Sequence, residues 1–175
     1  MKLSTLIIEL DRLDRLGIYA FTAATMRRIF CEDDRTMTKA LKAHAATGVI
    51  QRVARGLYVN PRARSLPADR LAAMVPWLRP PPDFSWLSLE SALSEAGLIS
   101  QLPSRLTLMT TGRSGVFDTP FGIIEFTHTN QDRPDTVWDD LRELNVATAP
   151  QAKSDLMRTK RNLGLVIEEV DDIET

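Results

Sequence analysis

The sequence predicts an α+β protein made of two domains, and three observations support this prediction. Residues 34–61 have the pattern of a capped helix, a glycine stop and two short strands joined by a basic turn. Prolines at 80–82 predict a stiff, extended segment inside the 175-residue chain. The first 66 residues are basic and the remainder is acidic. We therefore expect domains at 1–79 and 84–175, with residues 80–83 as the linker.

Two helices are predicted before residue 31. In the first, over 3–16, leucine and isoleucine recur at helical spacing and Gly17 ends the helix. Residues 18–21 are apolar, as is typical of a connecting strand or turn. Thr22 can cap the second helix, which has about two turns over 23–30.

A third helix is predicted to begin at Asp34, which can accept the free N–H groups of the first turn. Its apolar residues form one stripe, with Met37, Leu41 and Ala45 four residues apart. Gly48 supplies the left-handed conformation that commonly ends a helix. The opposite face is left to Arg35, Thr38, Lys39, Lys42 and Thr47.

A hairpin is predicted directly after this helix. Residues 49–53 and 57–59 are rich in β-branched and aromatic residues, and residues 54–56 between them form the loop, with Gly56 where positive φ is expected. The order of helix, helix, short acidic connection, capped helix and hairpin predicts a winged helix-turn-helix. A small α+β domain with an antiparallel hairpin and helices is expected to follow it.

The elements after the winged helix are predicted from the same signals. Residues 67–77 read as a helix with Pro67 at its start. Past the linker, we expect a helix over 88–97, a strand over 105–111 and a hairpin over 116–130. Val137, Leu141 and Leu144 mark a further helix, and Pro150 begins another. Residues 165–175 fit either a last strand or a frayed helix.

The charge of the two parts predicts their partners. The first 66 residues hold 12 basic and six acidic residues, while the remaining residues hold ten and 17, so the parts carry +6 and −7. A basic part of this kind is expected to meet a polyanion. Two plainer readings stay open, in which the domains simply differ in surface charge or attract each other.

Double-stranded DNA is the polyanion that a winged helix predicts. Its third helix enters the major groove, while cations elsewhere reach phosphates and the hairpin reaches the adjacent groove or backbone. Which cation reads a base is left open, because many contacts go to phosphate. The candidate DNA-binding residues are Arg27, Arg28, Arg35, Thr36, Thr38, Lys39, Lys42, Arg52 and Arg55.

Several segments between about Phe21 and Leu156 resemble the AbiEi-type antitoxins of type IV toxin–antitoxin systems. They are AATG at 45–48, IQRVARGLYV at 50–59, LSLESALSEAGL at 87–98, TTGR at 110–113 with FGIIEF at 121–126, and ATAPQA at 147–152. The resemblance implies an N-terminal winged helix that represses its own operon. It also implies a C-terminal region that opposes a nucleotidyltransferase toxin without a stable complex. The sequence stops soon after Ile173, where relatives often continue, so repression is expected to carry over more directly than antitoxin activity.

Other classes of protein are disfavoured by the sequence. Cys31 is the single cysteine, which excludes an internal disulfide and a cysteine-based zinc site. No apolar run reaches membrane-spanning length, so we expect a cytoplasmic protein without a membrane partner.

An enzyme and a cofactor are likewise not expected. Asp118, Glu125 and His128 are the best metal-site candidates, yet Glu125 and His128 are three apart on one predicted strand and point to opposite faces. Residues 112–115 read as a turn instead of a phosphate loop. The alternative to a DNA-binding repressor is a non-enzymatic adaptor whose winged helix binds an acidic protein.

Overall fold

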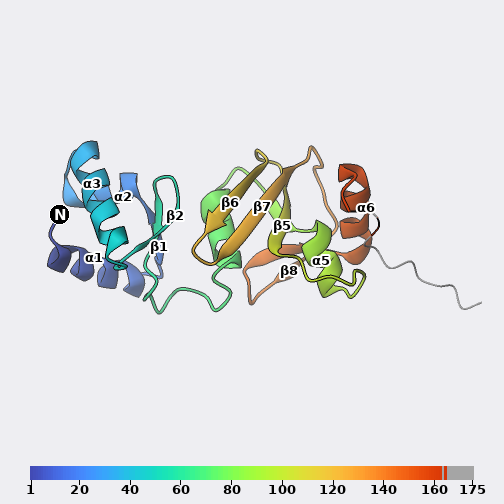
Figure 1. Ribbon diagram of the computed structural model, residues 1–175, viewed down its shortest axis with the longest axis horizontal. Coiled ribbons are helices and arrows are strands. Elements are labelled where there is room, and N and C mark those ends of the chain that lie inside the picture. Colours follow the sequence, from blue (N-terminus) through green and yellow to red (C-terminus); the bar gives the residue numbers. More distant parts are fainter. Residues whose placement is uncertain (163, 165–175) are drawn as a thin grey trace, which may run out of the picture. The chain divides into compact units, whose positions relative to one another are not determined.

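The computed structural model describes residues 1–162 and 164, and it is a mixed α and β protein (Figure 1). The described residues form six α-helices and two β-sheets. The chain divides into two compact units. The N-terminal unit comprises Met1–Pro80 together with Phe117–Ile123, and the C-terminal unit comprises Pro81–Val116 and the chain from Ile124 onward.

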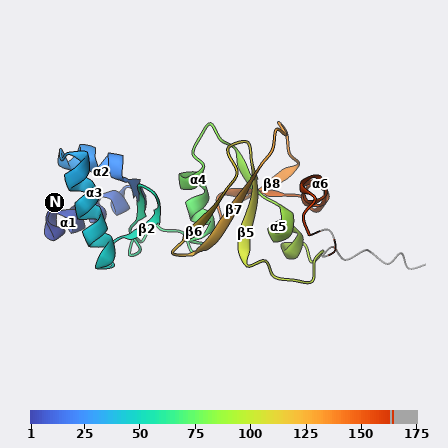
Figure 2. The same cartoon turned by 45° about the horizontal axis from the view of Figure 1, so that its top comes forward.

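The N-terminal unit begins with three helices and a small antiparallel sheet of strand order β1-β3-β2. Its first elements are α1 (Leu3–Arg15), β1 (Ala20–Thr22), α2 (Ala23–Phe30), α3 (Asp34–Ala46), β2 (Gln51–Ala54) and β3 (Leu57–Val59). The helices and the sheet share one core, to which every one of these elements except β2 contributes a fully or partly buried apolar side chain. Figures 1 and 2 show α2 and α3 side by side, with the β2–β3 hairpin following α3.

The predicted third helix is confirmed, but its predicted cap is wrong. Asp33 is the N-cap, and its Oδ1 accepts a hydrogen bond from the Thr36 N–H at 3.0 Å. Asp34 is instead the first helical residue, where an acidic side chain faces the positive end of the helix dipole. The sequence offers adjacent aspartates, so the choice between them depends on backbone geometry that the pattern does not specify.

The predicted hairpin is also confirmed, with a tighter loop than expected. Ala54 pairs with Leu57, so the connection is Arg55-Gly56 alone, and Gly56 has φ +75°. The Gly56 carbonyl accepts a hydrogen bond from the Ala23 N–H at 2.8 Å. This bond ties the hairpin tip to the start of α2.

The predicted helix over 67–77 is wrong in its first half. Helical structure begins only with a 3₁₀ turn, η1 (Ala72–Met74), and continues as α4 (Val75–Leu78). The Asp69 carboxylate accepts a hydrogen bond from the Ala72 N–H at 2.9 Å, which places the start of helical structure after Asp69. Tyr19 joins this segment to β1, because its hydroxyl donates to the Ala73 carbonyl at 3.2 Å.

The second sheet has six strands in the order β6-β7-β5-β4-β9-β8, and it lies in the C-terminal unit except for the parts of β6 and β7 within Phe117–Ile123. Strand β4 pairs antiparallel with β5 and parallel with β9, while β8 pairs antiparallel with β9. Helices α5 and α6 pack against each other (Figure 2). The elements are β4 (Ser85–Leu87), α5 (Leu89–Glu95), β5 (Arg105–Thr110), β6 (Gly115–Thr119), β7 (Gly122–His128), β8 (Thr136–Asp139), β9 (Leu144–Ala147) and α6 (Ala149–Thr159).

Most of these elements were predicted, but the helix expected around 137–144 is wrong. Strands β8 and β9 occupy this region, with Val137 paired to Val146. Val137 and Leu141 are 63% and 90% exposed, so their helical spacing reflects no buried stripe. Strand β4, which has only three residues, was not predicted. The alternatives for 165–175 lie outside the described residues.

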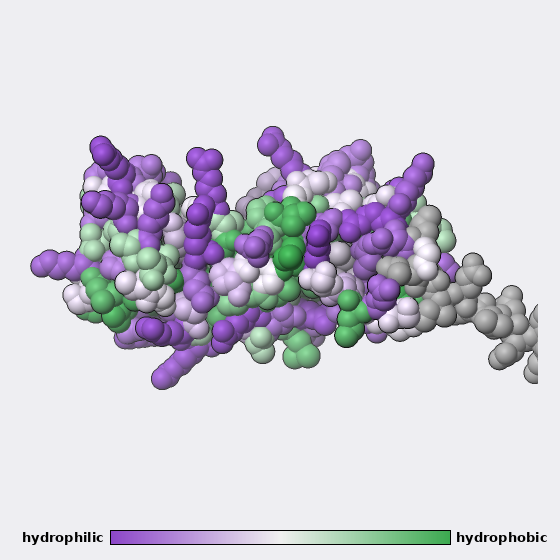
Figure 3. All heavy atoms as spheres, in the orientation of Figure 1, coloured by the Kyte–Doolittle hydropathy of each residue, from purple (hydrophilic) through white to green (hydrophobic). Residues whose placement is uncertain are grey.

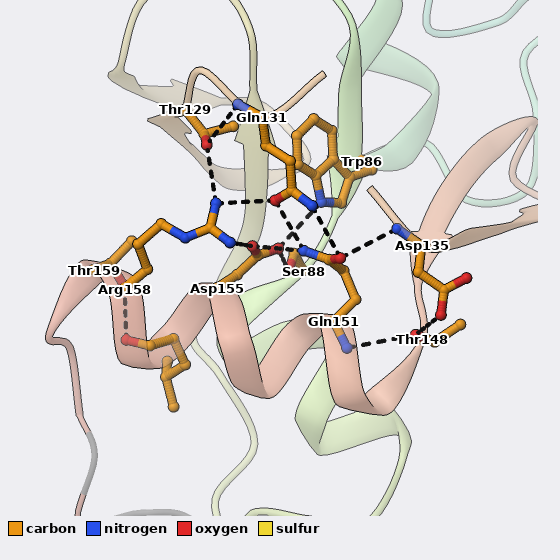
Figure 4. Close-up of polar contacts among 11 residues, drawn as sticks. Trp86, Ser88, Thr129, Gln131, Asp135, Thr148, Gln151, Asp155, Arg158 and Thr159 are labelled. Carbon is orange, nitrogen blue, oxygen red and sulfur yellow. Dashed lines mark hydrogen bonds and ion pairs between the residues drawn. The ribbon is translucent and has the colours of Figure 1, made fainter. Parts of the chain in front are cut away.

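A buried polar network holds α6 against β4 and the start of α5 (Figure 4). The fully buried Asp155 carboxylate accepts from the Ser88 hydroxyl at 2.7 Å, the Gln151 amide at 2.8 Å and the Trp86 indole N–H at 3.2 Å. Gln131 exchanges two hydrogen bonds with Gln151, which extends the network to the segment after β7. A buried carboxylate needs several donors to offset its desolvation, and these side chains supply them.

Candidate nucleic-acid interface

The exposed face of α3 gathers the predicted DNA-binding residues of that helix. Arg35, Thr38, Lys39 and Lys42 are spaced i, i+3, i+4 and i+7, so they share one face. Together with Asp34 they line a shallow depression in the surface of the N-terminal unit. Figure 3 shows long hydrophilic side chains projecting from this unit.

The core fixes the direction of this face. Met37 and Leu41 are buried against α1, α2 and β3 residues, so the opposite side of the helix faces outward. Thr36 does not belong to the cationic face. It lies one residue from Arg35, about 100° around the helix axis, and it serves the cap through its N–H bond to Asp33.

The acidic side chains at the connection before α3 have partners within the N-terminal unit. The Glu32 carboxylate pairs with the Met1 ammonium at 2.6 Å, and the Asp34 carboxylate pairs with Arg27 at 3.1 Å. Hydrogen bonds from the side chain and backbone of Thr36 hold the pKa of Asp33 below its usual value. Glu32 and Asp34 are therefore ion-paired and Asp33 is hydrogen-bonded, while Glu32 Oε2 is buried without a hydrogen-bond partner among the described residues.

Arg27 and Arg28, both on α2, differ in their surroundings. Arg27 is half-buried and its guanidinium is held by Asp34, so it braces α2 against the start of α3. Arg28 is exposed. The structure thus gives Arg27 a partner inside the protein that the sequence did not predict.

The hairpin carries the two remaining candidates. Arg55 is exposed at the tip, next to Gly56. Arg52 is also exposed, and its Nε–H donates to the Ala54 carbonyl at 3.2 Å, which lays the side chain along the hairpin.

Five of these cations form neither an ion pair nor a side-chain hydrogen bond among residues 1–162 and 164. They are Arg28, Arg35, Lys39, Lys42 and Arg55. Unpaired guanidinium and ammonium groups on a helix face and a hairpin are suited to bind phosphate oxygens, while long side chains in a groove can also donate to base edges.

Two of the three metal-site candidates, Glu125 and His128, have partners of their own, while Asp118 is exposed. The Glu125 carboxylate pairs with Arg105 at 3.0 Å and with Arg161. The His128 ring lies 2.7 Å from the Gly112 carbonyl and 3.0 Å from Asn130 Oδ1. Within the part of the chain that the structure describes, no three His, Cys, Asp or Glu side chains are grouped so that they could hold a metal ion.

None of the helices in the described residues has both the length and the apolar composition needed to cross a membrane. Comparison of the sequence with family models and curated proteins, and of the fold with solved structures, gave no match.

Proposed function

We propose that this protein is a transcriptional repressor that binds double-stranded DNA through an N-terminal winged helix-turn-helix. The observation that carries the proposal is the α3 face on which Arg35, Lys39 and Lys42 stand unpaired opposite the core. Unpaired cations on one side of a supported helix match what a DNA major groove requires.

The order of elements supports the same fold. The order of α1, β1, α2, α3 and the β2–β3 hairpin, with β1 pairing beside β3, supports the proposal of a winged helix. In this arrangement α3 is the recognition helix and the hairpin is the wing. Arg52 and Arg55 then reach the backbone or groove next to the one that α3 occupies.

The operon and the partner are proposed from the resemblance described above. We propose that the repressor acts on its own operon in the cytoplasm, and that it is the antitoxin of an AbiE-like type IV system, opposing a nucleotidyltransferase toxin without a stable complex. This part of the proposal assigns no catalytic role and no cofactor to the chain. It rests on sequence resemblance in both units.

A non-enzymatic adaptor that binds an acidic protein is the second candidate, because the same cations would serve it. The two functions differ in what the cations must fit. A DNA groove is bordered by two regular rows of phosphates, which the cations of a repressor must match. A repressor therefore binds duplex DNA, and it binds its own site more tightly than other sequences. An adaptor has no reason to prefer one duplex over another.

Fluorescence anisotropy with the full chain tests the proposal. The probes are a labelled duplex from the region upstream of the gene and a duplex of the same composition in scrambled order. We expect tighter binding to the upstream duplex. Expression of a reporter gene placed behind that region should also fall when the protein is present. Equal, weak binding to both duplexes, with no effect on the reporter, would reject the repressor and favour the adaptor.

A further inference from the structure

The outermost strand of the second sheet has an open edge. Strand β8 pairs with β9 along one side, and its other side has no neighbouring strand among the described residues. Open edges in proteins are usually protected by lysine, proline or a β-bulge, because they can pair with further chains. None of these devices lies within β8, whose pairing with β9 runs without a register shift. The edge is therefore suited to bind another strand.

The pairing with β9 determines which backbone groups of β8 point outward. In an antiparallel pair, consecutive residues direct their N–H and C=O groups alternately toward the partner strand and away from it. The Thr148 N–H donates to the Asp135 carbonyl at 3.0 Å in the same register, so the odd-numbered residues of β8 face β9. Thr136 and Trp138 therefore each direct an N–H and a C=O away from the sheet. No other segment of the described chain is hydrogen-bonded to these groups.

The side chains of β8 are exposed on both faces of the sheet. Successive residues of a strand point to opposite faces, and Val137 and Trp138 are 63% and 52% exposed. Leu141, just after the strand, is 90% exposed. The described chain therefore leaves both faces open here, and a strand added at this edge can pack an apolar side chain beside each of them.

The charge around this edge selects the kind of partner. Residues 132–143 contain five acids and two arginines, which gives a net charge of −3. Arg142 is already paired with Glu95 and Asp139, while Asp140 and Glu143 are exposed and form no ion pair in the described chain. Two copies of β8 placed side by side would bring these negative charges together, whereas a basic segment would neutralise them.

We propose that β8 binds an extended segment of a basic partner protein by β-strand addition. The partner backbone forms hydrogen bonds with the outward groups of Thr136 and Trp138, and its alternate apolar side chains pack beside Val137 and Trp138. Lysine or arginine side chains of the segment lie near Asp140 and Glu143. In this mode of recognition the backbone hydrogen bonds supply affinity, while the side chains supply selectivity. The proposal is independent of DNA binding, because every group lies within the C-terminal unit.

Fluorescence anisotropy with the full chain and no DNA tests the proposal. The probe is a labelled, end-capped peptide of alternating valine and threonine with lysines at both ends. One control peptide has glutamates in place of the lysines, and another is N-methylated at adjacent central residues, which blocks a backbone donor on each edge. We expect saturable binding of the lysine peptide. Each control should bind at least about tenfold more weakly, because it loses either charge attraction or backbone hydrogen bonds.

A pair of variants locates the site. Thr136→Pro removes an outward N–H but no hydrogen bond to β9, so an edge strand should tolerate it. Thr136→Val is the matched control, because it keeps the N–H and loses the same hydroxyl. We expect Thr136→Pro to bind the lysine peptide at least about tenfold more weakly than Thr136→Val, with equal far-ultraviolet circular dichroism spectra.

Amide hydrogen exchange of the wild type gives a readout that needs no variant. The N–H groups of Thr136 and Trp138 should exchange at least about tenfold more slowly with the peptide bound, while those of Val137 and Asp139 change little because they already face β9. The proposal is overturned if the lysine peptide shows no saturable binding, if the glutamate peptide binds as tightly, or if Thr136→Pro and Thr136→Val behave alike. A stable dimer that Thr136→Pro dissociates, measured by sedimentation, would also overturn it by assigning the edge to a second copy of the chain.

Discussion

The salt dependence of DNA binding measures how many cations of the proposed interface meet phosphates. Five candidates, Arg28, Arg35, Lys39, Lys42 and Arg55, form neither an ion pair nor a side-chain hydrogen bond among the described residues. If all five contact phosphates, the slope of log K against log salt is about −4.5, since each released counterion contributes about −0.9. Raising salt from about 50 to about 200 mM then weakens binding by about 500-fold.

Removing two of these cations should reduce the slope by a known amount. The double variant Lys39→Ala/Lys42→Ala keeps three unpaired candidates, so the expected slope is about −2.7 and the same salt increase costs about 40-fold. Both lysines are exposed, so folding stability should change by no more than about 0.5 kcal/mol. Anisotropy titrations at several salt concentrations give the slopes, and chemical denaturation gives the stability.

The matched control is Lys153→Ala, which removes an exposed lysine from α6 in the C-terminal unit. We expect its slope to equal that of the wild type. Equal slopes for the wild type and the double variant would refute the placement of α3 against phosphates. If Lys153→Ala lowered the slope by half as much as the double variant, which removes twice as many charges, then net charge, and not the α3 face, would govern binding.

Two further predictions concern the C-terminal unit. Asp155→Ala removes the acceptor shared by Trp86, Ser88 and Gln151, so the free energy of unfolding, measured by chemical denaturation, should fall by about 3–5 kcal/mol. The control is Ser154→Ala, which changes an exposed neighbour. A loss as small as that of the control would contradict the structural role of the network. Hydrogen bonds from Arg161 and Arg105 hold the pKa of Glu125 below its ordinary value of 4.5. Because the folded-state pKa is the lower one, Glu125 contributes stability above its unfolded pKa and loses it as pH falls through the folded pKa. The stability difference between the wild type and Glu125→Gln should therefore be full near neutral pH and shrink below about pH 4.5, as thermal melts across that range would reveal; a difference independent of pH would contradict this assignment.

The N-terminal elements could be predicted because their signals are local. Met37 and Leu41 repeat at helical spacing and are buried as expected, and Gly56 occupies the positive-φ position of a tight loop. The cationic face of α3 follows from the same periodicity, since the residues opposite a buried stripe must face outward. The sequence alone therefore placed Arg35, Lys39 and Lys42 on the outward face of this helix.

Features that depend on contacts distant in sequence could not be predicted. Strand β4 has three residues and pairs in parallel with β9. The two strands are far apart in sequence, so no local pattern predicts their pairing. Exposed apolar residues in the β8 region happen to recur at helical spacing. The sequence therefore predicted a helix where the structure has strands. Glu90 and Asn162, whose side chains form a hydrogen bond, are 72 residues apart.

Asp34 supports the fold through an ion pair, but its negative charge is unfavourable for DNA binding at the proposed interface. It lies on the depression lined by Arg35, Lys39 and Lys42, where a negative charge repels phosphate, and it also holds Arg27. Asp34→Asn removes this charge and frees the Arg27 guanidinium, so two changes act in the same direction.

We therefore expect Asp34→Asn to bind duplex DNA more tightly than the wild type at low salt, with a slope steeper by up to about 0.9 if Arg27 gains a phosphate. Asp140→Asn, which removes an exposed acid from the C-terminal unit, controls for the change in net charge. Unchanged or weaker binding by Asp34→Asn, with folding intact, would mean that DNA does not approach the start of α3. A gain confined to Asp34→Asn and accompanied by the steeper slope would indicate that the Arg27–Asp34 ion pair limits affinity because it holds one cation away from the duplex.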